Sequence, residues 1–287
     1  MFLTYTISEM KQYFIFLTLF FLVFFSTCEK NANKSCGLEV DDSNTLQNYE
    51  ILFIGNSHTY TYNIPTTIEQ IAKSKGDSII TQMEAPPGYS LEQHCSRQAT
   101  LDAIRSKKWD YVVLQEQGGI QALPTFMADT AFYQYAQYLA DKIRENWENT
   151  KIILYMTHGY KLGVLTWNDT AWCELDPLVC DYEGMQERVK DNYIALSELI
   201  NAEVAPAGMM WKILMKGNED FDLFSGDNLH ANSLGSYTSA LTLYAVISRR
   251  TVIGAYIPAN VSEEAANTVQ NTVNNSLYNC NPNWRDY

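Results

Sequence analysis

The segment EILFIGNSHTY, residues 50–60, decides the fold of this chain. Residues 50–55 predict a buried strand, because they form an apolar run that ends on a glycine. The chain then turns abruptly through Gly55, Asn56 and Ser57, which exposes the serine hydroxyl beside free backbone N–H groups. Open α/β sheets bind their ligands at the carboxyl ends of their strands. The segment therefore predicts a parallel sheet with a candidate site at Ser57.

The rest of the chain alternates short apolar runs with longer amphipathic stretches, which favours βαβ units around a parallel sheet. We expect strands at residues 50–55, 78–84, 111–115, 151–156 and 203–205. We expect helices at residues 64–75, 90–107, 125–149, 184–201 and 233–249, with a short one at 262–277. This order predicts an α/β fold, a three-layer α/β/α sandwich around a central parallel sheet of about five strands.

Residues 158–182 interrupt the alternation with a long, aromatic and cysteine-bearing segment. Long loops at the carboxyl end of a parallel strand usually carry function, so we expect this one to border the site. Its Tyr160, Trp167 and Trp172 are candidates for stacking against sugars, although aromatic residues are more often part of the core.

The first 28 residues predict an export signal. Residues 13–25 form an uncharged apolar run that is too short to span a bilayer comfortably. A start at Met10 would place a lysine directly before this run, so Met10 is a candidate start. Cys28 lies where a lipoprotein signal places its acylated cysteine, and ordinary secretion with cleavage nearby is the alternative. We therefore expect an exported protein, periplasmic or on the cell surface, with membrane attachment if Cys28 is lipidated.

A polar tether is expected at residues 29–48, followed by one domain at 49–287 with a C-terminal extension. Export would allow disulfides to persist. Cys173 and Cys180 flank a short segment and are the expected local bridge, and Cys36 and Cys280 are a candidate pair. Sequence alone does not fix this connectivity.

Composition excludes some classes of partner. The formal net charge of −13 and the lack of a basic run argue against nucleic acid, whose binders need clustered Lys and Arg. The sequence has four His, no CxxC and no HExxH, so we expect no metal and no organic cofactor. Its 287 residues are 46% hydrophobic, which fits one sizeable domain and leaves the oligomeric state open.

A partner motif for Ser57 lies near the other end of the chain, in LFSGDNLHANSLGSY at residues 223–237. A serine hydroxyl is a weak nucleophile unless a base takes its proton. His230 follows Asp227 by three residues, so one tight turn can bring the carboxylate to the imidazole. A lone serine after a strand is usually a turn residue, and a lone DxxH is usually a surface turn. Both motifs together, in this order, favour catalysis by Ser57, Asp227 and His230.

These two motifs resemble the SGNH (GDSL-like) hydrolase superfamily, in a divergent exported branch. GNS at residues 55–57 is similar to the family's first block, with Asn56 in place of its aspartate, and DNLH at 227–230 is similar to its last block. The resemblance covers roughly residues 49–249 and implies a flavodoxin-like sheet. It also implies a serine that attacks an acyl carbonyl, usually that of an ester.

The resemblance further implies an oxyanion hole. The N–H groups of Ser57 and of Gly88, which follows the second strand as the family's second block does, would bind the oxyanion. The family's third block carries an asparagine, which this chain replaces by LQEQGG at residues 114–119. Gln115 or Gln117 can supply a neutral amide N–H in its place. The alternative is that this segment is merely a strand end.

Three further residues are candidates for contact with substrate. His58 adjoins the nucleophile, His158 follows the fourth strand, and Glu116 can place a carboxylate near the pocket or form an ion pair. A structural role for His158 is an equal alternative. His94, on an expected helix, is interpreted as structural.

The sequence therefore predicts an ester hydrolase, a serine esterase that acts on carboxylic esters, with acetyl esters expected, of a small molecule or a glycan. An O-acyltransferase with the same triad is one alternative, because an acceptor hydroxyl can replace water. A glycan-binding lipoprotein that has lost the chemistry is another.

Overall fold

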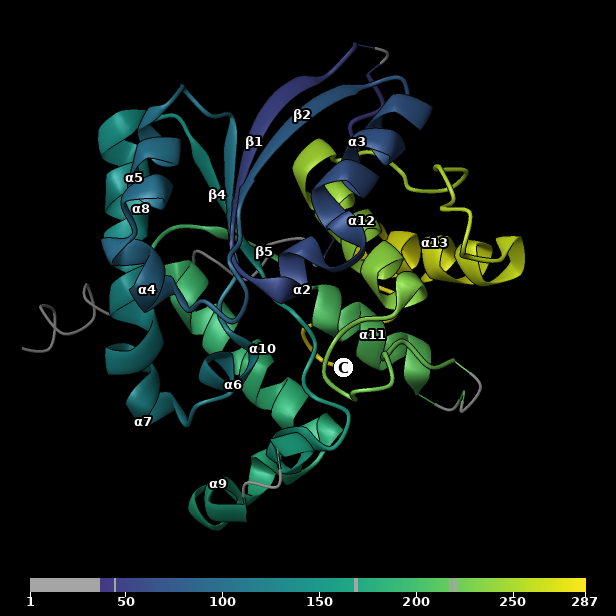
Figure 1. Cartoon of the computed structure of the whole chain (residues 1–287). Coiled ribbons are helices and arrows are strands. Elements are labelled where there is room, and N and C mark those ends of the chain that lie inside the picture. Colours follow the sequence, from purple (N-terminus) through teal and green to yellow (C-terminus); the bar gives the residue numbers. More distant parts are fainter. Residues whose placement is uncertain (1–36, 44, 168–169, 217, 219–220) are drawn as a thin grey trace, which may run out of the picture. The chain divides into compact units, whose positions relative to one another are not determined.

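The computed structural model describes residues 37–287, apart from residues 44, 168–169, 217 and 219–220 (Figure 1). The expected export signal, Cys28 and Cys36 lie outside the described residues, so the expectations for them stay predictions. None of the helices in the described ranges is long and apolar enough to cross a membrane.

The centre of the fold is a parallel sheet of five strands in the order β2-β1-β3-β4-β5. The strands are β1 (Asn48–Ile54), β2 (Ser78–Glu84), β3 (Tyr111–Leu114), β4 (Lys151–Tyr155) and β5 (Glu203–Ala205). Residues 51–54 of β1 are fully buried, because helices cover both faces of the sheet. The strand order is the doubly wound, flavodoxin-like one, which confirms the predicted α/β fold.

Helices form the two outer layers (Figure 1). On one face lie α3 (Ile64–Ser74) and α12 (Ser233–Ser248), and on the other lie α5 (Gln98–Arg105) and α8 (Gln134–Asn146). A further helix, α13 (Glu263–Tyr278), packs against α12. Residues 235–248 of α12 are all buried, since this helix has neighbours on both sides.

The remaining elements are short, except for the long helix α10 (Tyr182–Leu199). They are α2 (Ser57–Tyr60), η1 (Thr61–Asn63), α4 (Leu91–Ser96), α6 (Gly118–Gln121), α7 (Thr125–Ala128), η2 (Asp129–Tyr133), η3 (Gly163–Trp167), α9 (Thr170–Leu175), η4 (Pro177–Cys180) and α11 (Ala207–Met215). The single helix expected at 90–107 is divided into α4 and α5, because Arg97 adopts an extended conformation between them. The helix expected at 125–149 is divided by the π-helical turn η2.

The compact unit of the structure spans Gly37–Tyr287, so it includes residues 37–48, which lie in the segment expected to be a tether. The Leu38 N–H donates to the Leu277 carbonyl at 2.7 Å, and the Asp41 N–H donates to the Arg249 carbonyl at 2.8 Å. The last carbonyls of a helix lack donors inside that helix, and the N–H groups of this polar segment donate to such carbonyls at the ends of α12 and α13.

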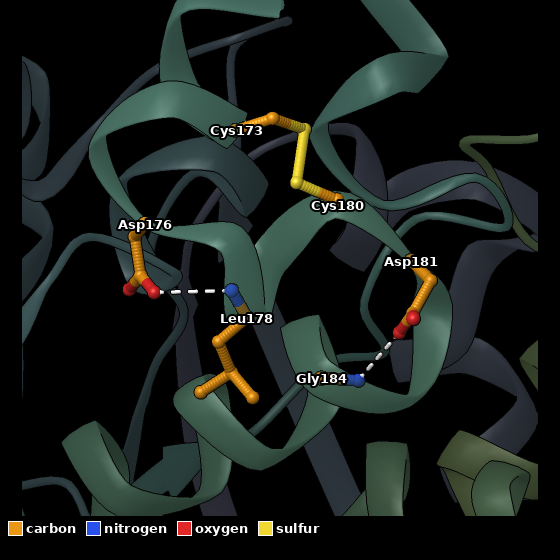
Figure 2. The surroundings of a disulfide bond; sticks show 6 residues. All are labelled: Cys173, Asp176, Leu178, Cys180, Asp181 and Gly184. Carbon is orange, nitrogen blue, oxygen red and sulfur yellow. Dashed lines mark hydrogen bonds between the residues drawn. A yellow bond between two sulfur atoms is a disulfide. The ribbon is translucent and has the colours of Figure 1, made fainter.

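The Cys173–Cys180 disulfide confirms the predicted local bridge, and Figure 2 shows it joining α9 to η4. Cys95 is a free, partly buried thiol. The proposed partner of Cys280 is Cys36, which lies outside the described residues, so this pairing stays a prediction.

Capping interactions hold the bridged segment and the start of α10 (Figure 2). The Asp176 carboxylate accepts from the Leu178 N–H at 3.2 Å, and the Asp181 carboxylate accepts from the Gly184 N–H at 2.8 Å. Arg188 on α10 pairs with Asp176 at 2.8 Å. A side chain at Gly184 would meet the Leu178 carbonyl oxygen at 1.8 Å, so only glycine permits this close approach.

Candidate active site

The turn after β1 is shaped by close packing against the end of β3. A Cβ at Gly55 would lie 2.4 Å from Gln115 Oε1 and 2.6 Å from Thr59 Oγ1, so only glycine fits. The Asn56 side chain caps α2 by accepting from the His58 N–H at 3.1 Å. Ser57 is therefore the first residue of a short helix at the carboxyl edge of the sheet.

His94 supports the same turn from α4. Its Nε2–H donates to the Gly55 carbonyl at 2.8 Å, and its Nδ1 accepts from the Thr100 hydroxyl at 2.8 Å. The ring is fully buried, and burial lowers the pKa of His94 to about 4. The structural role predicted for His94 agrees with these contacts.

The DNLH motif lies on a tight turn between α11 and α12. An antiparallel bridge between Phe224 and Ala231 closes its base, and the Ser225 N–H donates to the His230 carbonyl at 2.8 Å. Asn228 has a φ of 61°, in the left-handed region that asparagine tolerates better than most residues. This conformation lets the turn fold back so that Asp227 faces the ring of His230.

The three predicted catalytic side chains form one continuous hydrogen-bond chain. Asp227 Oδ2 is 2.7 Å from His230 Nδ1, and His230 Nε2 is 2.8 Å from Ser57 Oγ. A carboxylate can only accept, so Nδ1 carries the proton and Nε2 accepts from the serine hydroxyl. The side chain of His230 is 29% exposed and Ser57 is half-buried, so neither residue lies in the core.

Asp227 is held in its ionised form by its neighbours. Its Oδ1 accepts from the Ser225 hydroxyl at 2.7 Å, the Leu229 N–H at 3.0 Å and the His230 N–H at 2.9 Å. Partial burial acts to raise the pKa of Asp227, but the hydrogen bonds from His230, Ser225 and Leu229 hold that pKa well below its usual range. The carboxylate is thus a fixed acceptor for His230.

Gln115, one of the two expected oxyanion donors, has no free N–H. Its Oε1 accepts from the Asn56 N–H at 2.8 Å and the Thr59 hydroxyl at 2.9 Å. Its Nε2 donates to Asn56 Oδ1 at 3.0 Å and to the Glu116 carbonyl. The side chain is fully buried, so Gln115 shapes the nucleophile turn and does not fit the oxyanion role expected for it.

Gln117 differs in this respect. Its Oε1 caps α6 by accepting from the Gly119 N–H at 2.9 Å and the Ile120 N–H at 3.1 Å. Its amide nitrogen meets no acceptor in the part of the chain that the structure describes. Of the two glutamines, Gln117 is the one with an amide N–H left to donate.

Gly88 lies on a loop that is tied to the nucleophile turn, because Asn56 Nδ2 donates to the Tyr89 carbonyl at 2.8 Å. Gly88 is exposed, with a φ of 69°, and a Cβ there would meet nothing within 4 Å. Within residues 37–287 as described, the N–H groups of Gly88 and Ser57 find no acceptor. These two N–H groups are therefore free to bind an anionic oxygen.

His58 and His158 line the buried side of His230, with His58 only 6% exposed and 5.5 Å from the His230 ring between centroids. His158 is 1% exposed and stacks on Trp211 at 3.7 Å. Its Nε2–H donates to the Leu229 carbonyl at 2.9 Å. Burial lowers the pKa of both rings, that of His158 to about 4, so both are neutral near pH 7. Such burial does not fit the expected substrate contact of His158, which instead holds the turn that carries His230.

Two other expected substrate contacts are also buried. Glu116 is fully buried, and Tyr160 is 1% exposed. Trp172 packs partly buried against the core, and the side chain of Trp167 lies outside the described residues. The expectation that these aromatic residues form a sugar-stacking surface is therefore not met by Tyr160.

Some residues at the site were not anticipated. Ser225 binds the triad carboxylate, and its position two residues before Asp227 is a usable signal for a local side-chain turn. Trp211 supports His158 from α11, a helix whose nearly continuous apolar sequence gives no period to detect. No group of three or more His, Cys, Asp or Glu that could hold a metal ion occurs among the described residues.

Comparison with known proteins concerns the fold of the chain. No protein-family profile matches the sequence, and no curated protein matches it. The solved structures that it resembles include a DUF4886 family protein from Bacteroides uniformis, with a TM-score of 0.66 and 19% identity over 80% of this chain and 95% of that one.

Two further solved structures are named for hydrolases. An SGNH hydrolase candidate from Slackia heliotrinireducens gives a TM-score of 0.55 and 20% identity over 69% of this chain and 98% of that one. The acetyl xylan esterase AlAXEase gives a TM-score of 0.51 and 16% identity, again over 69% and 98%. Likenesses at these identities establish the fold, and the chain has the three-layer fold of the SGNH hydrolases.

Proposed function

We propose that the protein is a serine esterase that hydrolyses carboxylic esters through an acyl-enzyme on Ser57. The observation that carries the proposal is the hydrogen-bond chain from Ser57 Oγ through His230 to Asp227, with distances of 2.8 and 2.7 Å. Such a chain supplies both parts that an unreactive hydroxyl lacks, a base for its proton and an anion that orients the base.

In the proposed reaction, His230 Nε2 takes the hydroxyl proton of Ser57 as Oγ attacks the carbonyl carbon of the ester. The tetrahedral intermediate collapses when His230 donates that proton to the leaving alcohol, which leaves an acyl group on Ser57. A water molecule then gives its proton to His230 and attacks the acyl carbon. The acid departs and Ser57 recovers its proton. Asp227 stabilises the imidazolium in both halves, and no metal or organic cofactor takes part.

The oxyanion of each intermediate would be bound by the N–H groups of Ser57 and Gly88 and by the amide of Gln117. All three donors lack an acceptor among the described residues, and all three belong to the turn after β1 or to the loops after β2 and β3. Donors that are already oriented are effective because they need no reorganisation when charge develops. Gln117 takes the place of the third-block asparagine that this sequence lacks.

We further propose short acyl, chiefly acetyl, esters of carbohydrates as the substrate class. The likeness to an acetyl xylan esterase supports this choice at the level of fold. The predicted export signal also favours an extracellular or periplasmic glycan as substrate. Metabolic labelling with palmitate, compared between wild type and Cys28→Ser, tests the proposed lipid anchor, because only an acylated Cys28 incorporates the label.

The esterase assignment is tested by hydrolysis of p-nitrophenyl acetate. We expect Ser57→Ala and His230→Ala to lose activity by at least about 10³-fold, as expected for triad members. Ser43→Ala is the matched control, because Ser43 is exposed on the N-terminal segment, and it should retain full activity. Activity that survives both triad substitutions would contradict the proposal. Product analysis with an added acceptor alcohol separates hydrolysis from acyl transfer.

A further inference from the structure

A buried carboxyl group lies between the two loops that carry the proposed oxyanion donors. Glu116 lies two residues after the end of β3, and its side chain is fully buried. A single oxygen, Oε1, accepts from the Leu91 N–H at 3.1 Å and from the Gln117 N–H at 2.6 Å. Leu91 begins α4, three residues after Gly88. One oxygen atom therefore links the Gly88 loop to Gln117.

The backbone of Glu116 is also held in place. Its N–H donates to the Tyr193 hydroxyl at 3.4 Å, and its carbonyl accepts from the side-chain amide of Gln115. The second carboxyl oxygen, Oε2, is buried and has no hydrogen-bond partner in the described part of the chain. A carboxyl group in this position is expensive to bury, which favours a role that an apolar residue cannot fill.

We infer that Glu116 is a positioning residue, whose buried carboxyl fixes the Gly88 loop and Gln117 relative to each other and thereby sets the oxyanion hole. The inference rests on the proposed esterase function. Removal of the shared acceptor would leave two N–H groups unpaired, and both loops would be free to shift. Small displacements of oxyanion donors lower the rate of the chemical step more than they weaken the binding of substrate.

Among the described residues, the titratable groups that face this carboxyl are not cationic. They are Glu92 and Cys95 on α4 and Tyr193 on α10. Burial raises the pKa of Glu116 to about 8, against the hydrogen bonds from Gln117 and Leu91. The carboxyl is therefore mainly neutral at pH 7, with a carbonyl oxygen that accepts both N–H groups. Above pH 8 it becomes a buried anion beside the oxyanion hole, where it opposes the negative charge of the intermediate.

Two substitutions separate positioning from bulk stability. Glu116→Gln keeps a carbonyl oxygen in the same place, whereas Glu116→Met fills the same space without an acceptor. For p-nitrophenyl acetate at pH 7, we expect Glu116→Met to lower kcat on the order of 10²-fold with KM changed less than about threefold, as for loss of an oxyanion donor. Glu116→Gln should keep kcat within about threefold of wild type at this pH.

The pH profile supplies a second readout that does not require Glu116→Met to fold. We expect kcat of the wild type to fall as pH rises through about 8, and kcat of Glu116→Gln to stay level there. A folded Glu116→Met protein with wild-type kcat would overturn the inference. If Glu116→Met does not fold, the same dependence of kcat on alkaline pH in the wild type and in Glu116→Gln would overturn the inference.

Failure of the esterase assignment is distinguishable from failure of this inference. A wild-type protein that shows no Ser57-dependent hydrolysis contradicts the proposed function, and the inference falls with it. A wild-type protein that does hydrolyse the ester, with Glu116 variants that behave as wild type, contradicts only the role of Glu116.

Discussion

The side-chain amides of Gln115 and Asn56 are joined by a hydrogen bond of 3.0 Å from Gln115 Nε2 to Asn56 Oδ1. Gln115 Oε1 also accepts the backbone N–H of Asn56 at 2.8 Å. The residue that precedes the nucleophile is thus held at its side chain and at its backbone by one glutamine. Asn56, which takes the place of the aspartate in the GDS motif, is matched to this amide, because its Oδ1 accepts from Gln115 while its Nδ2 donates to Tyr89.

The first prediction concerns this pair. Gln115→Leu should lower the free energy of unfolding by about 1–3 kcal/mol, because it leaves buried polar groups of Asn56 and Thr59 without partners. Urea denaturation measures this loss, and kcat should fall with it because the nucleophile turn is loosened. A Gln115→Leu protein as stable as wild type would show that the amide pairing does not hold the turn.

Gln117→Leu should behave differently. It removes a helix cap, which lowers the free energy of unfolding by about 1 kcal/mol. It also removes the proposed oxyanion donor, so kcat should fall on the order of 10²-fold with little change in KM. Steady-state kinetics and urea denaturation, each carried out on Gln117→Leu and on Gln115→Leu, measure these two effects. If Gln117→Leu retained wild-type kcat, Gln117 would not be the oxyanion donor.

His158→Phe tests the support of the turn that carries His230. Phenylalanine keeps the stack on Trp211 but cannot donate to the Leu229 carbonyl. We expect kcat to fall by about tenfold, since one lost hydrogen bond to the turn corresponds to about 1.4 kcal/mol. Unchanged kcat, in a protein with unchanged unfolding temperature, would show that this hydrogen bond does not position His230.

The pH dependence of stability tests the burial of Glu116. Its pKa is about 8 in the folded protein and near 4.5 when unfolded, so the folded state binds more protons between these values. The free energy of unfolding should therefore decrease as pH rises from about 5 to 8. Glu116→Gln should remove this part of the slope. Parallel curves for the two proteins, from urea denaturation at several pH values, would argue that the carboxyl ionises freely.

The sequence predicts most of the sheet, because β1, β3 and β4 contain short apolar runs that end near polar or glycine residues. It does not predict the break at Arg97, because a single extended residue leaves the helical pattern of apolar residues unchanged. It does not predict helix α11 either, because an unbroken apolar stretch has no helical period to detect. The N-terminal limit of the fold also escapes prediction. The polar composition of residues 37–48 predicts a tether, because their hydrogen bonds to the ends of α12 and α13 leave no sign in the sequence.

The candidate triad is predicted from two short motifs, because Ser57 and His230 each stand in a recognisable local context. The sequence does not decide between Gln115 and Gln117 as oxyanion donor. That choice depends on which side-chain amide is already hydrogen-bonded, and the partners of Gln115 lie 56 or more residues away in the chain. The burial of His158 and Glu116 is likewise a tertiary property. Both residues follow strands, and only packing decides whether such residues face a substrate or the core.

The central claim is that Ser57 is a nucleophile activated by His230 and Asp227. The most direct measurement is reaction of the purified protein with a fluorophosphonate, followed by mass spectrometry of the labelled peptide. We predict one adduct on Ser57 in the wild type and in Ser43→Ala, and none in Ser57→Ala, with labelling strongly slowed in His230→Ala and Asp227→Asn. A folded wild-type protein without an adduct on Ser57, or with labelling as fast in His230→Ala as in the wild type, would contradict the claim.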